Sequence, residues 1–337
     1  MTQAATVAGK HWQFEEVPCD YCGSSDTDLL LTGRDWLHGL PGEFHVVACR
    51  KCGLARTNPR PTLESLATAY PGNYEPFRSP RLDALTPTGL LRWALVNYRG
   101  YPLGRPWPML VRMLAAPLGA LLLRHRGRVG YFPWGGEGRL LDFGCGSGQY
   151  VAAMAAAGWQ AEGLDLSPEA VRIGRQAGLT VHRGTLPGAD LPVQSYDVIT
   201  LWHSIEHVPS PRATLEAARP LLRPGGRLVI ACPRLDGPSA GRYGTYWYGL
   251  DVPRHLTHFT REHLGRHLVS CAYKVMRFLA VRRPAMIRES LLRRAQATGQ
   301  RGHRLLAESR FWPRLLSHRD VLLGNTDEMI CIARAAP

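Results

Sequence analysis

The chain has 337 residues, of which 45% are hydrophobic and 20% charged, which is ordinary for a globular protein. This length allows one full α/β domain and one or two smaller modules. The formal net charge of +14 suits anionic partners such as phosphate, nucleic acid or an acidic membrane surface. An arginine-rich genome would produce the same surplus without such a partner. Residues 1–10 lack the apolar core of a signal peptide, so we expect a cytoplasmic protein.

Two C-x-x-C-G pairs lie near the start of the chain: Cys19 with Cys22, and Cys49 with Cys52. The glycine after each pair allows a tight turn whose N–H groups point at metal-bound sulfurs. Four thiolates at this spacing fit a tetrahedral Zn²⁺ site. Two disulfide bonds or free structural thiols are the alternatives, and a reducing cytoplasm disfavours the disulfides. We therefore predict a structural zinc ribbon over residues 11–75.

Residues 76–136 read as a helical linker or cap with a strongly apolar run at Pro108–Leu123. Arg112 and Pro117 interrupt this run, whereas about 20 uninterrupted apolar residues are needed to cross a bilayer. An apolar helix flanked by arginines could lie on a membrane surface or cover an apolar substrate. We favour a third arrangement, in which the run packs on the neighbouring domain, so membrane contact is not the preferred expectation.

A glycine-rich segment follows a short apolar run at Leu140–Gly148. Gly144, Gly146 and Gly148 can adopt positive φ angles and let a ligand approach the main chain. The N–H groups of the turn and of the next helix then face that ligand. About twenty residues on, a second apolar run ends in Asp165, where an acid accepts hydrogen bonds from a ribose diol in Rossmann-type proteins.

The periodicity of the rest predicts a sheet with intervening helices. Expected helices cover Gln149–Ala157 and Pro168–Ala177, the second capped by Ser167. Two basic helices, Ile287–Gln296 and Arg301–Leu316, are expected in a long connection near the end. The expected strands are Leu140–Cys145, Ala161–Leu166, Leu179–Gly184, Tyr196–Trp202, Arg227–Cys232, Tyr273–Val281 and Glu328–Ala333.

Four motifs in order resemble the class I S-adenosylmethionine-dependent methyltransferases: Leu140–Gly148, Ser195–His203, Ser204–Val208 and Leu222–Ile230. The resemblance implies an α/β fold with a Rossmann-like seven-stranded sheet that ends in an antiparallel hairpin. With the zinc ribbon and helical substrate-cap insertions, it places the methyltransferase domain at residues 137–337. The insertions would cover residues 236–270 and 284–326.

The resemblance also implies which residues meet S-adenosylmethionine. Asp142 would hold the methionine amino group, Asp165 the ribose, and the residues after the third strand the adenine. An acid often follows that strand in the family, whereas this chain has Thr185, which weakens the parallel. The implied cofactor-binding residues are Asp142, Gly144, Cys145, Gly146, Gly148, Asp165, Leu166, Thr185, Leu186, Trp202 and His203.

Histidines provide the predicted acid–base chemistry. The run Leu250–Thr260 resembles the D-x-P-R-H-L-x-H-F-T segment of zinc-ribbon methyltransferases from sugar and natural-product pathways. It also resembles the E-H-x-x-Y-F-S stretch of deoxysugar C-methyltransferases, in which the matching histidine is a proposed base. That alignment implies His255 as the base, with Arg254 as a contact for an anionic substrate group. His258 is a further candidate, although a histidine before a helix often serves packing. Glu206 and His207 complete the predicted catalytic set, while an E-H-V segment also occurs in methyltransferases of many substrate classes.

An aromatic stretch precedes this run, with Tyr246, Trp247 and Tyr248. These side chains could stack on a sugar or planar ring, or form an ordinary packed loop. We expect a small-molecule methyltransferase, and favour C-methylation of a nucleotide-activated sugar or natural-product precursor. O-methylation of a natural product, or RNA methylation through the ribbon, are the alternatives. The dispersed basic residues disfavour nucleic acid, and the sequence predicts no oligomeric state.

Overall fold

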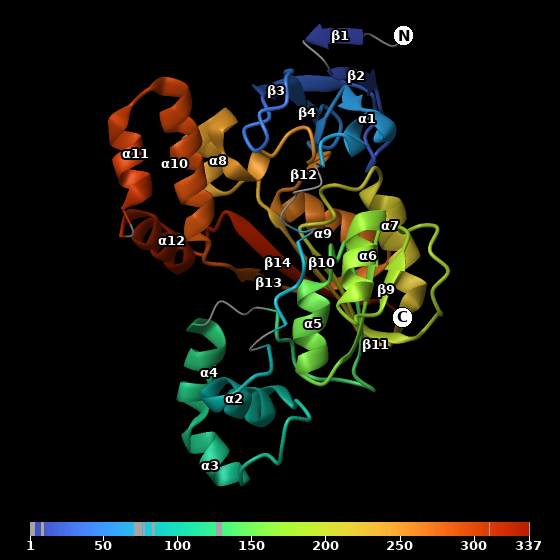
Figure 1. The fold of residues 1–337 in the computed structure, drawn as a ribbon, viewed down its shortest axis with the longest axis vertical. Coiled ribbons are helices and arrows are strands. Elements are labelled where there is room, and N and C mark those ends of the chain that lie inside the picture. Colours follow the sequence, from blue (N-terminus) through green and yellow to red (C-terminus); the bar gives the residue numbers. More distant parts are fainter. Residues whose placement is uncertain are drawn as a thin grey trace. The chain divides into compact units, whose positions relative to one another are not determined.

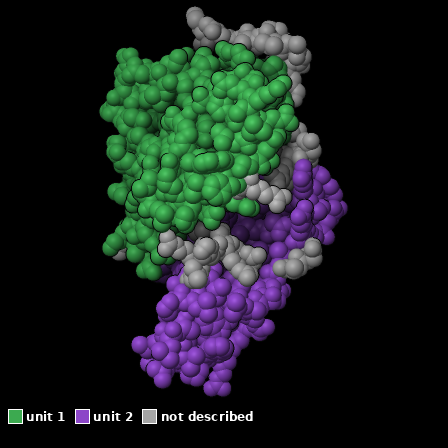
Figure 2. Space-filling model, turned by 90° about the vertical axis from the view of Figure 1, so that its left-hand side faces the viewer, with its two compact units in different colours: residues 1–71, 203–216, 230–336 green, residues 72–202, 217–229, 337 purple. Residues whose placement is uncertain are grey.

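The structure is a computed structural model that describes residues 4–7, 10–70, 76, 78–82, 85–125, 130–309 and 311–336. The expected exit of the ribbon at residues 71–74 lies outside these ranges, as do residues 126–128 of the helical linker. The chain divides into two compact units (Figure 2). Unit 1 comprises residues 1–71, 203–216 and 230–336, and unit 2 comprises residues 72–202 and 217–229 together with residue 337.

A seven-stranded mixed sheet confirms the predicted fold class (Figure 1). Its order is β13-β14-β11-β10-β7-β8-β9. Strands β10, β7, β8 and β9 pair in parallel, whereas β13 and β14 form the expected antiparallel hairpin. The strands are β7 (Arg139–Phe143), β8 (Gln160–Asp165), β9 (Val181–Arg183), β10 (Tyr196–Trp202), β11 (Leu222–Pro233), β13 (Tyr273–Ala280) and β14 (Glu328–Ala335).

Local signals set most element boundaries in the sheet region. Helices α5 (Gln149–Ala156) and α6 (Pro168–Gln176) lie where the sequence predicts them. Ser167 caps α6 as expected, since its hydroxyl accepts a hydrogen bond from the Ala170 N–H at 3.2 Å. The largest error in a strand boundary is at β11, which begins at Leu222, five residues before the predicted Arg227, so the R-P-G-G turn belongs to the strand. Helix α7 (Pro211–Ala218) precedes it.

The ribbon contributes a four-stranded sheet of order β12-β5-β4-β3. Its strands are β3 (Thr27–Gly33), β4 (Phe44–Cys49), β5 (Ala55–Thr57) and β12 (Thr257–His258). Strand β12 comes from the predicted substrate-cap insertion at residues 236–270, called the lid below, and pairs antiparallel with β5. A further sheet of β1 (Ala4–Val7), β2 (Lys10–Glu15) and β6 (Arg60–Pro61) precedes α1 (Leu63–Ala67). A hydrophobic core containing Trp12, Phe44, Trp247 and Ile287 joins ribbon, lid and C-terminal helices within unit 1.

The remaining helices of unit 1 fill the two predicted insertions. They are α8 (Pro238–Tyr243), α9 (Arg261–Ser270), α10 (Pro284–Thr298), α11 (Arg301–Glu308) and α12 (Trp312–Leu322). The stretch predicted as helical over Arg301–Leu316 is two helices, because α11 ends at Glu308 and α12 begins at Trp312, with Pro313 in its first turn. Proline is favoured in the first turn of a helix and breaks one in its interior.

Unit 2 carries a separate group of helices: α2 (Gly89–Arg99), α3 (Met109–Leu114) and α4 (Ala116–His125). They hold the apolar run that we expected to pack on the neighbouring domain. That expectation was wrong for α3, which buries none of its residues. Among the described residues, no helix combines the length and apolarity that crossing a membrane requires.

Candidate active site and metal centre

The glycine-rich turn follows β7 and leads into α5. Gly144, Gly146 and Gly148 have φ angles of 71°, 54° and 90°, which residues with a Cβ rarely adopt. A side chain at Gly146 would also overlap the backbone oxygen of Pro76. The turn thus requires glycine both for conformation and for close approach. Cys145 lies between the glycines, and its thiol contacts the Gly146 carbonyl at 3.3 Å.

Asp142 is buried at the end of β7, with 3% of its surface exposed. The Thr200 hydroxyl of β10 donates a hydrogen bond of 2.6 Å to its carboxylate. Burial, and to a smaller degree the nearby charge of Asp165, raises the pKa of Asp142 to about 7. Such a carboxyl group favours a cation beside it, because a positive charge would offset the cost of burying the negative one.

Asp165 stands at the end of β8. Its two carboxylate oxygens accept hydrogen bonds from the N–H groups of Gly146 at 2.8 Å and Ser167 at 2.9 Å. Each oxygen retains acceptor capacity, because a carboxylate offers about four lone-pair sites in all. The carboxylate is therefore oriented by the glycine turn and can still meet hydroxyl groups.

The other predicted cofactor contacts in unit 2 are spread over three strand ends. Leu166 is 67% exposed, Thr185 is half-buried and Leu186 is buried. Trp202 ends β10 and stacks on Phe132 with ring centroids 5.9 Å apart. The structure places these side chains at the strand ends where the resemblance puts adenine and ribose, and their contact with a cofactor stays a prediction.

His203 follows Trp202 directly and opens the part of the chain that belongs to unit 1. It has a left-handed φ of 51°, and its ring lies between two carboxylates. Nδ1 is 3.4 Å from Glu206 and Nε2 is 3.2 Å from Glu328. Burial opposes the charge on the ring, but Glu328 and Glu206 outweigh it and raise the pKa of His203 to about 10. His203 is therefore an imidazolium at neutral pH.

Glu328 is a partner that the sequence analysis missed. It is 1% exposed and also accepts two hydrogen bonds from Arg283, of 2.5 and 2.9 Å. Burial is outweighed by His203 and Arg283, which hold the pKa of Glu328 at about 2. It starts the last strand, and no local pattern distinguishes it from any strand-initiating acid.

Glu206, His207 and His255 converge in the interior of unit 1. Their ligand-type oxygen and nitrogen atoms lie within 4.8 Å of one another. Glu206 is 1% exposed, and its carboxylate accepts no hydrogen bond from the residues that the structure describes. The Nε2 atom of His255 is 3.9 Å from this carboxylate. A small cavity of about 10 Å³ lies beside Glu206 and His255.

A backbone carbonyl fixes the protonation of the His255 ring. Nδ1 of His255 is 2.9 Å from the Gly249 oxygen, which can only accept, so this Nδ1 carries a proton and a neutral ring keeps its lone pair on Nε2. Nδ1 of His207 lies 3.1 Å from the Arg254 oxygen and 3.0 Å from the Tyr70 hydroxyl, which can donate or accept. Burial, followed by repulsion from His255, lowers the pKa of His207 to about 4. His207 is therefore neutral, whereas His255 presents Nε2 to a buried carboxylate.

His258 belongs to the support of this cluster. Its Nε2 lies 3.1 Å from the Thr57 hydroxyl, which itself donates a 2.7 Å hydrogen bond to the His255 carbonyl. Burial, and secondarily the charge of His255, lowers the pKa of His258 to about 3. The N–H groups of Leu256 and Thr257 donate to the Glu206 carbonyl. The lid segment thus forms hydrogen bonds both with ribbon strand β5 and with the E-H-V turn.

Arg254 occupies a different place from the one expected for a substrate contact. It is fully buried, and its guanidinium pairs with Asp35 at 2.6 Å and Asp251 at 2.7 Å. Asp35 was missed by the sequence analysis, because its partner is 219 residues away. The geometry gives Arg254 a structural role in joining the lid to the ribbon.

The aromatic stretch is split between core and surface. Trp247 is 2% exposed and belongs to the hydrophobic core of unit 1. Tyr246 and Tyr248 are half-buried; Tyr246 packs against Trp36, and Tyr248 lies under the Arg293 guanidinium. The two tyrosines can meet a ligand without unfolding the core, whereas Trp247 serves packing.

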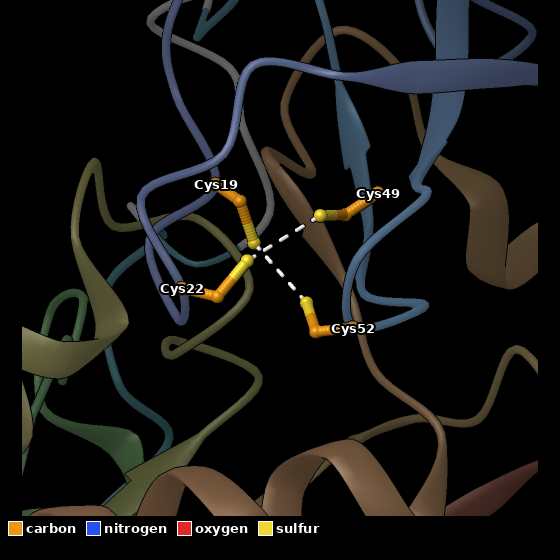
Figure 3. Close-up of side chains that lie close together, drawn as sticks. All are labelled: Cys19, Cys22, Cys49 and Cys52. Carbon is orange, nitrogen blue, oxygen red and sulfur yellow. Dashed lines mark hydrogen bonds between the residues drawn. The ribbon is translucent and has the colours of Figure 1, made fainter.

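The four predicted ribbon cysteines form one cluster (Figure 3). The sulfurs of Cys19 and Cys52 are 3.5 Å apart, as are those of Cys22 and Cys49, and none is in a disulfide bond. A tetrahedral Zn²⁺ with Zn–S bonds of about 2.3 Å separates its sulfurs by about 3.8 Å. The donor set and spacing fit zinc. Each short contact joins a cysteine of the first C-x-x-C turn, or knuckle, to a cysteine of the second.

The chain was compared with known proteins. Residues 117–270 match a family described as a methyltransferase domain. Ubiquinone biosynthesis O-methyltransferases of Xanthomonas euvesicatoria pv. vesicatoria and Xanthomonas oryzae pv. oryzae are 37% and 38% identical over 100 residues. Each match covers 28% of this chain and 42% of the relative, so the chain spans less than half the length of these relatives.

Among solved structures, the chain is similar to a complex of the Haloferax volcanii Trm112 methyltransferase activator and a methyltransferase. That match has a TM-score of 0.45 and 16% identity, and covers 61% of this chain and 85% of the other. The geranyl diphosphate C-methyltransferase of Streptomyces coelicolor A3(2) has a TM-score of 0.41 and 15% identity, with coverages of 59% and 71%.

The parallel sheet, its glycine turn and the acids at the ends of β7 and β8 define a nucleotide-cofactor-binding α/β protein. With the family match over residues 117–270, this part of the chain is identified as a methyltransferase domain.

Proposed function

We propose that this protein transfers the methyl group of S-adenosylmethionine to a small biosynthetic molecule, at an atom that loses a proton to His255. The observation that carries the proposal is the arrangement of His255 itself. Its Nδ1–H is held by the Gly249 carbonyl, and its Nε2 lies 3.9 Å from the buried Glu206 carboxylate. A proton accepted at Nε2 creates an imidazolium beside that carboxylate, which stabilises it.

The residues proposed here to bind the cofactor belong to unit 2. S-adenosylmethionine supplies a methyl group on a sulfonium, which is already a good leaving group. Asp142 would meet the cationic amino group, because its buried carboxyl gains most from a positive neighbour. Asp165 would accept from the ribose hydroxyls through the acceptor sites left open by the glycine turn. The backbone at Gly144–Gly148 would allow the close approach.

The proposed reaction is an in-line displacement. A bond forms between the acceptor atom and the methyl carbon while the carbon–sulfur bond breaks and S-adenosylhomocysteine leaves. The acceptor proton passes to Nε2 of His255. Positioning supplies most of the acceleration in such a transfer, and the base matters when the acceptor is a hydroxyl or a carbon acid.

Two classes of acceptor fit this chemistry. The lid resemblance favours C-methylation of a nucleotide-activated sugar or natural-product precursor, in which a carbonyl acidifies the neighbouring carbon. The curated relatives are named as O-methyltransferases, which supports a hydroxyl acceptor. Both acceptors must lose a proton, so His255 has the same role in each.

We further propose that Cys19, Cys22, Cys49 and Cys52 bind a structural Zn²⁺. The knuckle turns fit this role, because the N–H groups of Gly23 and Gly53 donate to the carbonyls of Cys19 and Cys49 at 2.8 Å. The bound metal would fix the ribbon strands, of which β5 supports the His255 segment. Metal analysis of the purified protein should give one zinc per chain, lost in Cys49→Ser. A metal-free wild-type protein of unchanged stability would refute this site.

Radiolabelled S-adenosylmethionine should be incubated with the protein and three acceptor panels: nucleotide sugars, phenolic natural products and bulk RNA. We expect transfer to one small-molecule panel, with kcat lowered at least about 100-fold in His255→Ala. His45→Ala is the matched control, because His45 is exposed on β4 and should leave kcat unchanged. Turnover of RNA alone, or equal kcat in His255→Ala, would overturn the proposal.

Treatment with a chelator distinguishes His255 acting as a base from a metal-binding role of the same cluster. Glu206, His207 and His255 could instead hold a divalent cation. Turnover that a mild chelator abolishes and Mg²⁺ restores, without loss of zinc, would support the cation.

A further inference from the structure

We infer that the segment from α2 to α4 binds an anionic membrane surface. The first observation is α3, Met109–Leu114, in which no residue is buried. Leu110, Met113 and Leu114 have 70%, 66% and 76% of their surface exposed. Six adjoining apolar residues are also exposed: Leu90, Trp107, Pro108, Met109, Val111 and Leu118. Grouped exposure of this kind marks an interaction surface.

Hydrogen bonds and close packing fix the orientation of α3. The Trp107 N–H donates to the Asn97 side chain at 2.8 Å, and the Tyr98 hydroxyl donates to the Arg112 carbonyl at 2.8 Å. Helix α4 packs closely on α2, because a Cβ at Gly119 would overlap the Tyr98 ring. The apolar side chains therefore point outward from a braced support (Figure 1 shows α2, α3 and α4 together).

The positive charge of this segment favours an anionic partner. Residues 85–136 contain seven arginines and no lysine, aspartate or glutamate. Arg105, just before α3, is exposed, and Arg112 is half-buried within it. An apolar helix with basic neighbours lies in the plane of a lipid interface, where the arginines meet anionic headgroups. Trp107 is suited to the same lipid interface, since a tryptophan ring favours the headgroup region of a bilayer. The uniform positive charge disfavours a second copy of the same surface.

The partner is thus a bilayer that contains anionic lipid, and binding needs neither methyl transfer nor cofactor. The test is flotation of the full-length protein with vesicles of phosphatidylcholine alone or mixed with phosphatidylglycerol. We expect flotation with the anionic vesicles only, weakening as salt rises. Arg105→Gln and Arg112→Gln should each lower the partition coefficient about fivefold.

Leu110→Ser/Met113→Ser/Leu114→Ser should abolish flotation, and its folding is checked by an unchanged thermal midpoint. The matched control is Leu305→Ser/Leu322→Ser/Leu323→Ser, which removes leucines of 68%, 68% and 71% exposure from α11 and from the α12 end. This control should float like wild type. Loss of flotation in the control alone would overturn the proposal. So would a lipid-free dimer that fails to float and that the α3 variant converts to monomers.

Discussion

The Thr57 hydroxyl donates a 2.7 Å hydrogen bond to the backbone carbonyl of His255, which lies 198 residues later in the chain. The same hydroxyl is 3.1 Å from His258, and the Thr57 N–H donates to the Leu256 carbonyl. One buried residue of the ribbon thus forms hydrogen bonds with three residues of the lid, His255, Leu256 and His258. This makes the ribbon part of the support for the proposed base.

Replacing Thr57 with valine should weaken both stability and catalysis. Valine has a similar shape but leaves the His255 carbonyl and the His258 ring without their partner, at a cost of about 1–3 kcal/mol. We expect a lower kcat with an unchanged KM for S-adenosylmethionine. Thr32→Val is the control, because the Thr32 hydroxyl lies 3.0 Å from the exposed His45 ring, outside the His255 cluster. Urea unfolding and steady-state kinetics test this, and equal effects in the two variants would contradict it.

Removing the charge of Arg254 should destabilise unit 1 severely. Arg254→Met leaves Asp35 and Asp251 without their cation, and breaking a buried pair costs about 3–5 kcal/mol. Arg50→Met is the control, because its bond to Asp28 is equally short at 2.6 Å but exposed, and we expect no measurable loss. Chemical denaturation compares the two. A stable Arg254→Met protein with a raised KM for an anionic acceptor would instead support a substrate contact.

Affinity for S-adenosylmethionine should depend on pH through Asp142. The pKa of about 7 in the free protein means that the carboxyl is partly protonated at neutral pH. A cationic amino group favours the ionised form, so binding releases a proton and the Kd falls as pH rises towards 7, then levels off. Calorimetry in buffers of different ionisation enthalpy measures the release. Asp142→Asn should bind weakly without pH dependence; a pH-independent wild type would contradict the assignment.

His203 should make the free energy of unfolding fall at alkaline pH. Its pKa is about 10 in the folded protein against 6.5 for a free histidine. The folded ring therefore keeps a proton that the unfolded chain has lost between these values. Its stabilising contribution is complete below pH 6.5 and disappears as pH rises through about 10. Urea titrations of wild type and His203→Gln should converge towards pH 10, and parallel curves would disprove this.

Local physical rules made much of the fold predictable from the sequence. The glycine turn was predictable because only glycine tolerates three positive φ angles in five residues. The N-cap of α6 followed from a short-range pattern, whereas the antiparallel end of the sheet was implied by the family resemblance. The four cysteines were predictable as a group because the chemistry of a tetrahedral metal requires that set. The signals for the glycine turn, the N-cap and each C-x-x-C pair lie within a few residues.

Contacts between distant segments were not predictable in the same way. Asp35 and Glu328 look like ordinary surface acids in the sequence, yet each is buried beside a cation. The exposure of α3 was also hidden, because an apolar helix reads alike whether it is buried or not. The predicted substrate role of Arg254 had the same weakness, since its distant partner Asp35 lies in a loop of the ribbon.

The sequence by itself determined the sheet, the glycine turn and the cysteine cluster, because those depend on backbone conformation and short spacing. Only the tertiary structure decided which charges are paired, which rings carry a proton, and which apolar side chains stay in water. Those properties depend on burial and on neighbours from other segments, and burial sets the cost of every charge.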